Sequence, residues 1–128
     1  MCLYKTHRFP KISTKPIKCY KVVEYLGDNN YESEFMGYRF KLGDTIKSAR
    51  HWLFAIFNDE LTDEVVHAYT FCLETKIDHG FAFCIETNET WIETWIECEI
   101  PPFTPYWIGR LGNIGAARIK TIKEVQKK

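Results

Sequence analysis

Several features that would assign a protein to a definite class are missing from this sequence. No apolar run approaches the ~20 residues of a membrane-spanning helix, and the first ten residues hold no apolar stretch typical of a secretory signal. The C-x-x-C pair of structural zinc sites is absent from the five cysteines, which are Cys2, Cys19, Cys72, Cys84 and Cys98. We therefore expect a cytoplasmic chain with free cysteines, no metal, no cofactor and no membrane partner.

Acidic residues are absent from residues 1–23, which hold six basic side chains. Residues 108–128 hold six more against one acid, Glu124. The stretch between them holds sixteen acids and five bases, so a formal net charge of zero conceals +6, −11 and +5. If the two ends lie side by side, this distribution predicts a basic face and an acidic face. It limits the possible partners but indicates no reaction.

Length and composition predict one domain. A chain of 128 residues, 45% of them hydrophobic, is long enough to bury an apolar core, so residues 1–128 are taken together. Residues 1–16 are basic and carry two prolines, which predicts an extended arm or edge segment. Strand-forming patterns occupy residues 17–26, 31–36 or 38–42, 81–85, 91–100 and 106–108. Residues 117–125 fit a final strand or a short helix.

Helical spacing appears in residues 44–57. Asp44 is a suitable N-cap, and apolar residues recur along one helix face at Ile46, Ala49, Leu53 and Phe57. Residues 60–76 fit either a capped helix, which we favour narrowly, or a β-branched and aromatic strand. The sequence therefore predicts an α+β fold, a mostly antiparallel sheet with one or two helices packed on one face.

Two motifs suggest chemistry only weakly. Residues 109–115 contain three glycines and an arginine, which suits either a phosphate-binding loop or, more commonly, a turn between strands. Glu97 and Glu99 lie two apart on a predicted strand, so their carboxylates point the same way and suit hydrolysis or cation binding; a solvated strand face is the commoner meaning. We assign no catalytic residue.

The basic ends also carry aromatic rings, at Tyr4, Phe9, Tyr20, Tyr106 and Trp107. Lysines for phosphates and rings for base stacking are what single-stranded nucleic acid binding requires. The ordinary alternative is that lysines protect edge strands from aggregation. The candidate nucleic-acid-binding residues are Lys11, Lys15, Lys18, Arg110, Arg118 and Lys120.

The outward face of residues 91–100 carries Trp91 and Trp95, and outward-facing tryptophans suit a protein partner. We therefore expect a small binding or accessory module, non-enzymatic, with a protein partner that meets Trp91 and Trp95 or the basic face. Single-stranded nucleic acid is the second hypothesis, and a nucleotide-using enzyme with Glu97 or Glu99 and Arg110 is the third.

Two resemblances accompany these patterns. Phe9-Pro10-Lys11-Ile12 near the start, with Tyr106-Trp107-Ile108-Gly109 near the end, resembles small uncharacterised proteins of gut Bacteroides-type bacteria and their phages, which bring no established activity. The order of Cys19-Tyr20-Lys21-Val22 and a later Glu97 and Glu99 is also similar to ADP-ribosyltransferases. That second resemblance implies NAD as substrate, with an early-strand residue near Lys21 and a late-strand glutamate gripping it.

Overall fold

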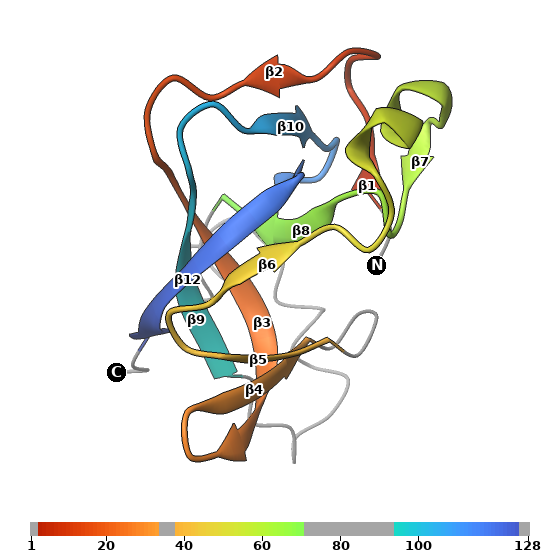
Figure 1. The fold of residues 1–128 in the computed structure, drawn as a ribbon. Helices are drawn as coiled ribbons and strands as arrows, with labels where there is room; N and C mark the ends of the chain where they lie inside the picture. The colour runs from red at the N-terminus through yellow and green to blue at the C-terminus, as the bar shows by residue number, and fades with distance from the viewer. Residues whose placement is uncertain (1–2, 34–37, 71–93, 126–128) are drawn as a thin grey trace.

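Antiparallel sheet makes up nearly all of the structure (Figure 1), a computed structural model that describes residues 3–33, 38–70 and 94–125. A 3₁₀ helix, η1, spans Trp52–Phe57 and is the one helical element of those residues. The strands in chain order are β1 (Leu3–Tyr4), β2 (Lys11–Ile12), β3 (Ile17–Gly27), β4 (Asn30–Ser33), β5 (Arg39–Lys41), β6 (Thr45–Lys47), β7 (Glu60–Leu61), β8 (Val66–Tyr69), β9 (Thr94–Ile100), β10 (Pro105–Ile108), β11 (Asn113–Ala116) and β12 (Arg118–Val125).

Ten of these strands belong to one sheet. Its order is β2-β10-β11-β8-β3-β9-β12-β6, with β4 paired to β3 and β5 paired to β4. The long strand β3 connects the parts of this sheet, because Ile17 to Val23 pair with β9 and Val23 to Gly27 pair with β4. The strands β1 and β7 form a separate two-stranded sheet. Within the described residues, no helix is long and apolar enough to cross a lipid bilayer.

The predicted α+β fold, with one or two helices packed on a sheet face, is wrong. Residues 44–57 form β6 and η1 instead of one α-helix. Ile46 pairs with Ile119 of β12, and Asp44 closes the turn before β6 by accepting the Lys41 N–H at 3.0 Å, so it caps no helix. Pairing with β12 satisfies the backbone and buries Ile46, and this tertiary contact overrides the local helical spacing.

The helix favoured for residues 60–76 is also wrong over its described part. Residues 60–70 form β7, a turn and β8, and residues 71–76 lie outside the described residues. Val66 and Ala68 of β8 are buried while His67 and Tyr69 are half-buried, an alternation with the period of a strand. The β-branched Val65 and Val66 indicated this outcome better than the acidic start of the segment did.

The strand predictions are confirmed where they fall on described residues. Residues 17–26 form β3, and both alternatives for the second strand are present, as β4 and β5, with residues 34–36 of the first alternative outside the described residues. Residues 91–100 form β9 from Thr94 onward, residues 106–108 belong to β10, and residues 117–125 form β12 rather than a helix. The predicted strand at residues 81–85 lies outside the described residues.

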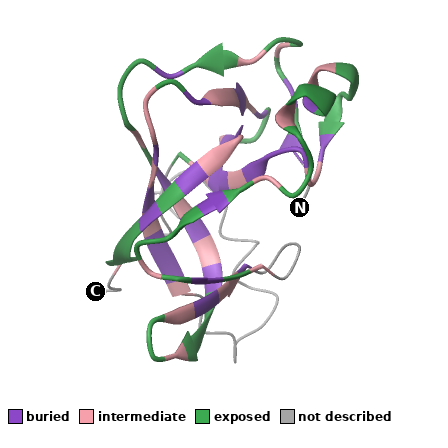
Figure 2. Ribbon diagram, in the orientation of Figure 1, coloured by how far each residue is buried: buried purple, intermediate pink, exposed green. Residues whose placement is uncertain are grey.

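The core has two parts, and Figure 2 colours the buried residues purple. The larger one lies under β3, β9 and β12 and includes Cys19, Ile96, Cys98 and Ile119, all at most 1% exposed. The smaller one joins β1 and β7 to η1 and β10 through Leu3, Ala55, Leu61, Val65 and Trp107. This second core holds η1 against the sheet.

Gly115 explains part of the glycine-rich segment at residues 109–115. A Cβ atom added there would lie 2.6 Å from Val65 Cγ2 and 3.1 Å from Leu3 Cδ1, so the smaller core has no room for a side chain. Gly112 adopts a φ of 80° in the turn between β10 and β11, a conformation that favours glycine. Gly115 thus permits close packing and Gly112 permits a turn. The last three residues of the segment, from Asn113, already belong to strand β11.

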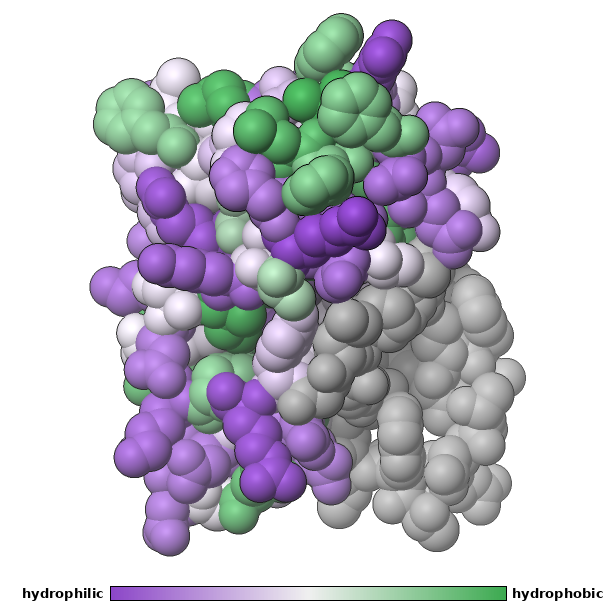
Figure 3. Space-filling model, turned by 45° about the vertical axis from the view of Figure 1, so that its right-hand side comes forward, coloured by the Kyte–Doolittle hydropathy of each residue, from purple (hydrophilic) through white to green (hydrophobic). Residues whose placement is uncertain are grey.

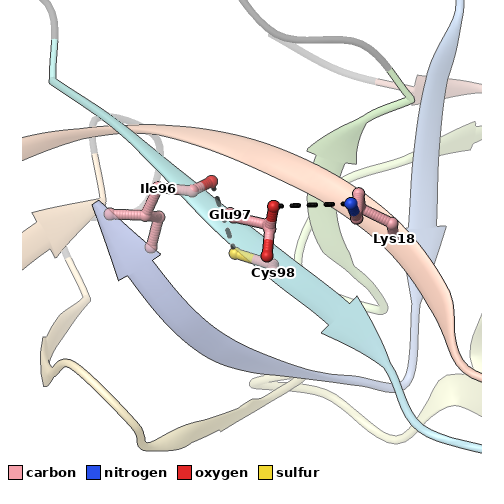
Figure 4. Close-up of polar contacts among 4 residues, drawn as sticks. All are labelled: Lys18, Ile96, Glu97 and Cys98. Carbon is pink, nitrogen blue, oxygen red and sulfur yellow. Dashed lines mark hydrogen bonds and ion pairs between the residues drawn. The ribbon is translucent and has the colours of Figure 1, made fainter. Parts of the chain in front are cut away.

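Charges that are separated in the sequence meet across the strands of the sheet. Glu99 of β9 is the register partner of Lys18 on β3 and of Lys120 on β12. Lys18 Nζ also lies 3.6 Å from Glu97 Oε1, and Figure 4 shows this ion pair bridging β3 and β9. The two basic ends therefore flank an acidic strand, and the outer side of these three strands carries Glu97 and Glu99 among a larger number of cations.

Replacing Glu99 with Lys would put three lysines in one row across β3, β9 and β12. We expect E99K to lose about 1–2 kcal/mol of unfolding free energy, because like charges opposite one another destabilise a sheet. The loss should shrink when urea unfolding is repeated at about 500 mM instead of about 20 mM NaCl, since salt screens exposed charges. E99Q is the control, with an expected loss of about 0.5 kcal/mol. Equal, salt-independent losses for both variants would contradict the charge row.

Candidate functional site

Of the two tryptophans predicted to meet a partner, Trp95 is buried. Trp95 is 2% exposed, and its ring packs at 5.8 Å, centroid to centroid, against the Tyr69 ring. Trp91 lies outside the described residues. Trp95 occupies an outward position of β9, as predicted, but neighbouring elements cover it, which the alternation of one strand does not reveal.

The six basic residues proposed for nucleic acid divide into three groups. Lys18 and Lys120 flank Glu99. Arg110 lies in the turn after β10, where its N–H donates to Tyr4 O at 3.2 Å. Lys11, Lys15 and Arg118 lie near the 101–105 segment, because Ser13 N–H donates to Thr104 O at 3.1 Å and Ala117 N–H donates to Pro105 O at 3.0 Å. The structure thus brings parts of both basic ends together and leaves Arg110 apart.

The residues of the enzyme hypothesis do not converge. Lys21 is buried on the core side of β3, where Nζ donates to His67 O at 2.6 Å. Glu97 and Glu99 lie on the opposite face of β9, because Lys21 pairs with the core residue Ile96 while Tyr20 pairs with Glu97. In the sheet order, β11, β8 and β3 separate β9 from β10, which leads into Arg110. The arrangement implied by the ADP-ribosyltransferase resemblance is therefore not formed.

Cys19 and Cys98 are free thiols that face each other across β3 and β9. Burial raises the pKa of Cys98 to about 12 and raises the pKa of Cys19 further. Cys98 Sγ points to Ile96 O at 3.8 Å, as Figure 4 shows. Thiols that remain protonated at neutral pH are poor nucleophiles, so this pair packs the core.

A surface that the sequence patterns did not indicate lies around η1 and the arm residues 5–9. An open pocket of about 490 Å³ separates the arm from the end of η1. The arm contributes the polar part of its lining and η1 the apolar part. The lining residues are Lys5, Thr6, His7, Arg8, Ile56, Phe57 and Asp59.

Lys5 joins the arm to the helix. Its side chain is 7% exposed in total, and Nζ donates to Ala55 O at 2.7 Å, to Ile56 O at 3.3 Å and to Arg8 O at 3.4 Å. Burial lowers the pKa of Lys5, and the Asp59 charge partly offsets that effect. The last carbonyls of a helix lack partners within it, so the ammonium adds donors at the end of η1, where Ala55 O also accepts the Asn58 N–H at 3.4 Å.

Two histidines hold the same region in place. The Ile108 N–H donates to His7 Nε2 at 3.1 Å, so His7 Nδ1 carries the proton and donates to Phe9 O at 2.7 Å. His51 Nδ1 accepts the Leu53 N–H at 3.2 Å at the start of η1. The arm is thereby fixed to β10, and η1 has a polar cap at its beginning and the Lys5 ammonium at its end.

Apolar side chains project from this rigid base. The exposed fractions are 63% for Phe9, 47% for Leu53, 46% for Phe54 and 77% for Phe57. Arg8 lies over the Phe9 ring at 5.4 Å, and Arg50 lies over the Phe54 ring at 4.5 Å. Figure 3 shows apolar side chains gathered at one end of the molecule. We define the η1 surface as Arg8, Phe9, Arg50, Leu53, Phe54 and Phe57.

In comparisons with known proteins, the chain matches no protein-family model, no curated protein and no solved structure. Function therefore has to be inferred from the geometry of the described residues.

Replacing Lys5 with Met removes the ammonium but keeps an unbranched side chain. We expect K5M to lose about 2–3 kcal/mol of unfolding free energy, because the Ala55 and Ile56 carbonyls lose their buried donor. The rate of amide hydrogen exchange should increase most in residues 52–57, while the exchange rates of the amides of β9 should change less. K11M is the control because Lys11 is exposed. A urea midpoint for K5M equal to that of K11M would show that Lys5 does not hold the helix.

Proposed function

We propose that this chain is a binding module that recognises a partner protein through the η1 surface, and that the partner contributes an apolar segment flanked by carboxylates. The observation that supports this proposal is the set of exposed rings on η1, a helix that is hydrogen-bonded to side chains at both ends. Leaving Phe57 at 77% exposure in water brings no stability to the isolated domain. An exposed apolar group on a rigid support is what a docking surface requires, because little conformational freedom is lost on binding.

The charges on this surface favour carboxylates on the partner. Arg8 and Arg50 are exposed, and neither forms an ion pair with a described residue. Each guanidinium lies over a phenylalanine ring, and an exposed guanidinium can bind a carboxylate through two parallel N–H donors. Arginine and aromatic residues are also the types that contribute most to protein interfaces.

Nucleic acid fits this surface less well. Asp59 and Glu60 are exposed beside the pocket and would repel phosphates. The aliphatic Leu53 and the closely placed Phe54 and Phe57 form an apolar area instead of single rings alternating with cations. A protein segment can place apolar side chains on the apolar area and carboxylates beside the two arginines.

A phage-displayed library of random peptides, selected on the immobilised protein, tests this proposal. We expect the enriched peptides to combine aromatic or aliphatic residues with Asp or Glu. Their affinity should fall about tenfold or more for F57S, since a central exposed ring is a typical hot spot, and severalfold for R50Q. Stability should change little, because both side chains are exposed.

The matched control is L26S, which removes another exposed apolar side chain, 43% exposed, at the end of β3. Peptides should bind L26S and the unmodified protein equally. Selection that enriches no sequence, or peptides that bind F57S as tightly as the unmodified protein, would overturn the proposal.

A further inference from the structure

Two cations face each other on β12 and β6. Arg118 and Lys47 are direct register partners. Both project from the outer side of the sheet, because Ile119 and Ile46, the next pair along, are buried. Like charges opposite one another destabilise an antiparallel pair, and neither residue forms an ion pair with a described acid. An anion from outside the chain that lies between them would remove this repulsion.

The pair belongs to a larger basic area on the same face. Along the outer side of the sheet, the next set of residues paired across β3, β9 and β12 is Lys18, Glu99 and Lys120. The set after it is Tyr20, Glu97 and Lys123. The two glutamates thus lie among more cations than they can neutralise. We define the basic face as Lys18, Lys47, Arg118, Lys120 and Lys123.

A strained aromatic residue lies in the segment that connects β9 to β10, two residues before Pro105. Phe103 has a φ of 60° and is 75% exposed. A left-handed conformation costs a residue with a side chain about 1 kcal/mol or more, and exposing the ring adds no stability. Such a conformation persists only where the surroundings hold it, and strained residues of this kind cluster at binding sites.

Ser13 holds the Phe103 backbone in place. Phe103 N–H donates to Ser13 O at 2.6 Å, and Thr104 N–H donates to Ser13 Oγ at 2.9 Å. Ser13 Oγ in turn donates to Pro101 O at 2.6 Å. The loop meets the start of β12, because Ala117 N–H donates to Pro105 O at 3.0 Å, one residue before Arg118. Lys15, which is exposed, lies two residues after Ser13.

We infer that the basic face and Phe103 together bind single-stranded nucleic acid, a function separate from that of the η1 surface. The cations contact phosphates, with the Arg118 and Lys47 pair on one of them, and the Phe103 ring stacks on an unpaired base. A duplex offers phosphates but keeps its bases stacked inside, so Phe103 gains nothing from it. Of the six residues predicted from the sequence, this site includes Lys18, Arg118 and Lys120 and leaves out Lys11, Lys15 and Arg110. It adds Lys47, Lys123 and Phe103.

Fluorescence anisotropy with a labelled oligo-dT strand and a labelled duplex tests the inference. We expect the single strand to bind at about 50 mM salt and to weaken steeply by about 200 mM. The double variant K47Q/R118Q should lower the slope of log affinity against log salt by about 0.7 for each phosphate that the protein no longer neutralises. F103G should weaken binding about fivefold or more with the slope unchanged, because stacking carries no counterion.

Glycine is the informative replacement for Phe103. Glycine adopts positive φ without strain, so F103G removes the ring and keeps the backbone that is hydrogen-bonded to Ser13. A urea midpoint equal to or above that of the unmodified protein would confirm that the fold is intact. R50Q, which removes a positive charge outside the basic face, is the control and should bind oligo-dT normally. K47Q/R118Q should bind the selected peptides normally, so the two proposals fail independently.

Three results would overturn the inference. They are the absence of oligo-dT binding at about 50 mM salt, equal binding of the single strand and the duplex, and unchanged oligo-dT binding by F103G.

Discussion

The acidic strand β9 lies between the two basic segments of the chain, and the rest of the sheet extends from that arrangement. β3 pairs with β9 along Ile17 to Val23, and β12 pairs with the other edge of β9 from Lys120 to Val125. Toward the core, the three strands contribute Cys19, Ile96, Cys98 and Ile119 to one cluster. Toward solvent, they alternate basic, acidic and basic side chains. The same pairing therefore buries the apolar positions and neutralises part of the charge.

This arrangement also places the two candidate surfaces. The outer face of β3, β9, β12 and β6 carries the basic face, and the segment that leads out of β9 carries Phe103. At the other core, β1 and β7 fasten η1 to β10 through Leu3, Leu61 and Trp107. The Lys5 ammonium then completes the carbonyl end of that helix. Each surface combines a hydrogen-bonded backbone with an exposed ring, Phe57 in one and Phe103 in the other, that adds nothing to the stability of the isolated domain.

Local patterns in the sequence predicted the strands better than they predicted the fold. The alternation in residues 17–26 and 91–100 is strong because each strand has a clearly buried side. The helical spacing of residues 44–57 was misleading, since Ile46 pairs with Ile119, more than seventy residues away, and Leu53 and Phe57 face solvent. No pattern within fourteen residues contains that information, because the pairing partner lies near the end of the chain.

The candidate sites show the same limit. Sequence alone suggested that the lysines of both ends were a possible site, and part of that set does come together beside Pro105. The sequence did not suggest Phe103, because its positive φ depends on the hydrogen bonds around Ser13, ninety residues earlier. Trp95 was predicted to be accessible from the alternation of one strand, and its burial beside Tyr69 results from elements that the alternation does not describe.

The central claim is that Glu99 lies between Lys18 and Lys120, and exchanging the charges of this row tests it most directly. The triple variant K18E/E99K/K120E restores opposite charges on neighbouring strands. Our account predicts that it regains about 1 kcal/mol of unfolding free energy over both E99K and K18E/K120E at low salt. A triple variant no more stable than E99K would show that these strands are not neighbours and would contradict the arrangement on which the two surfaces depend.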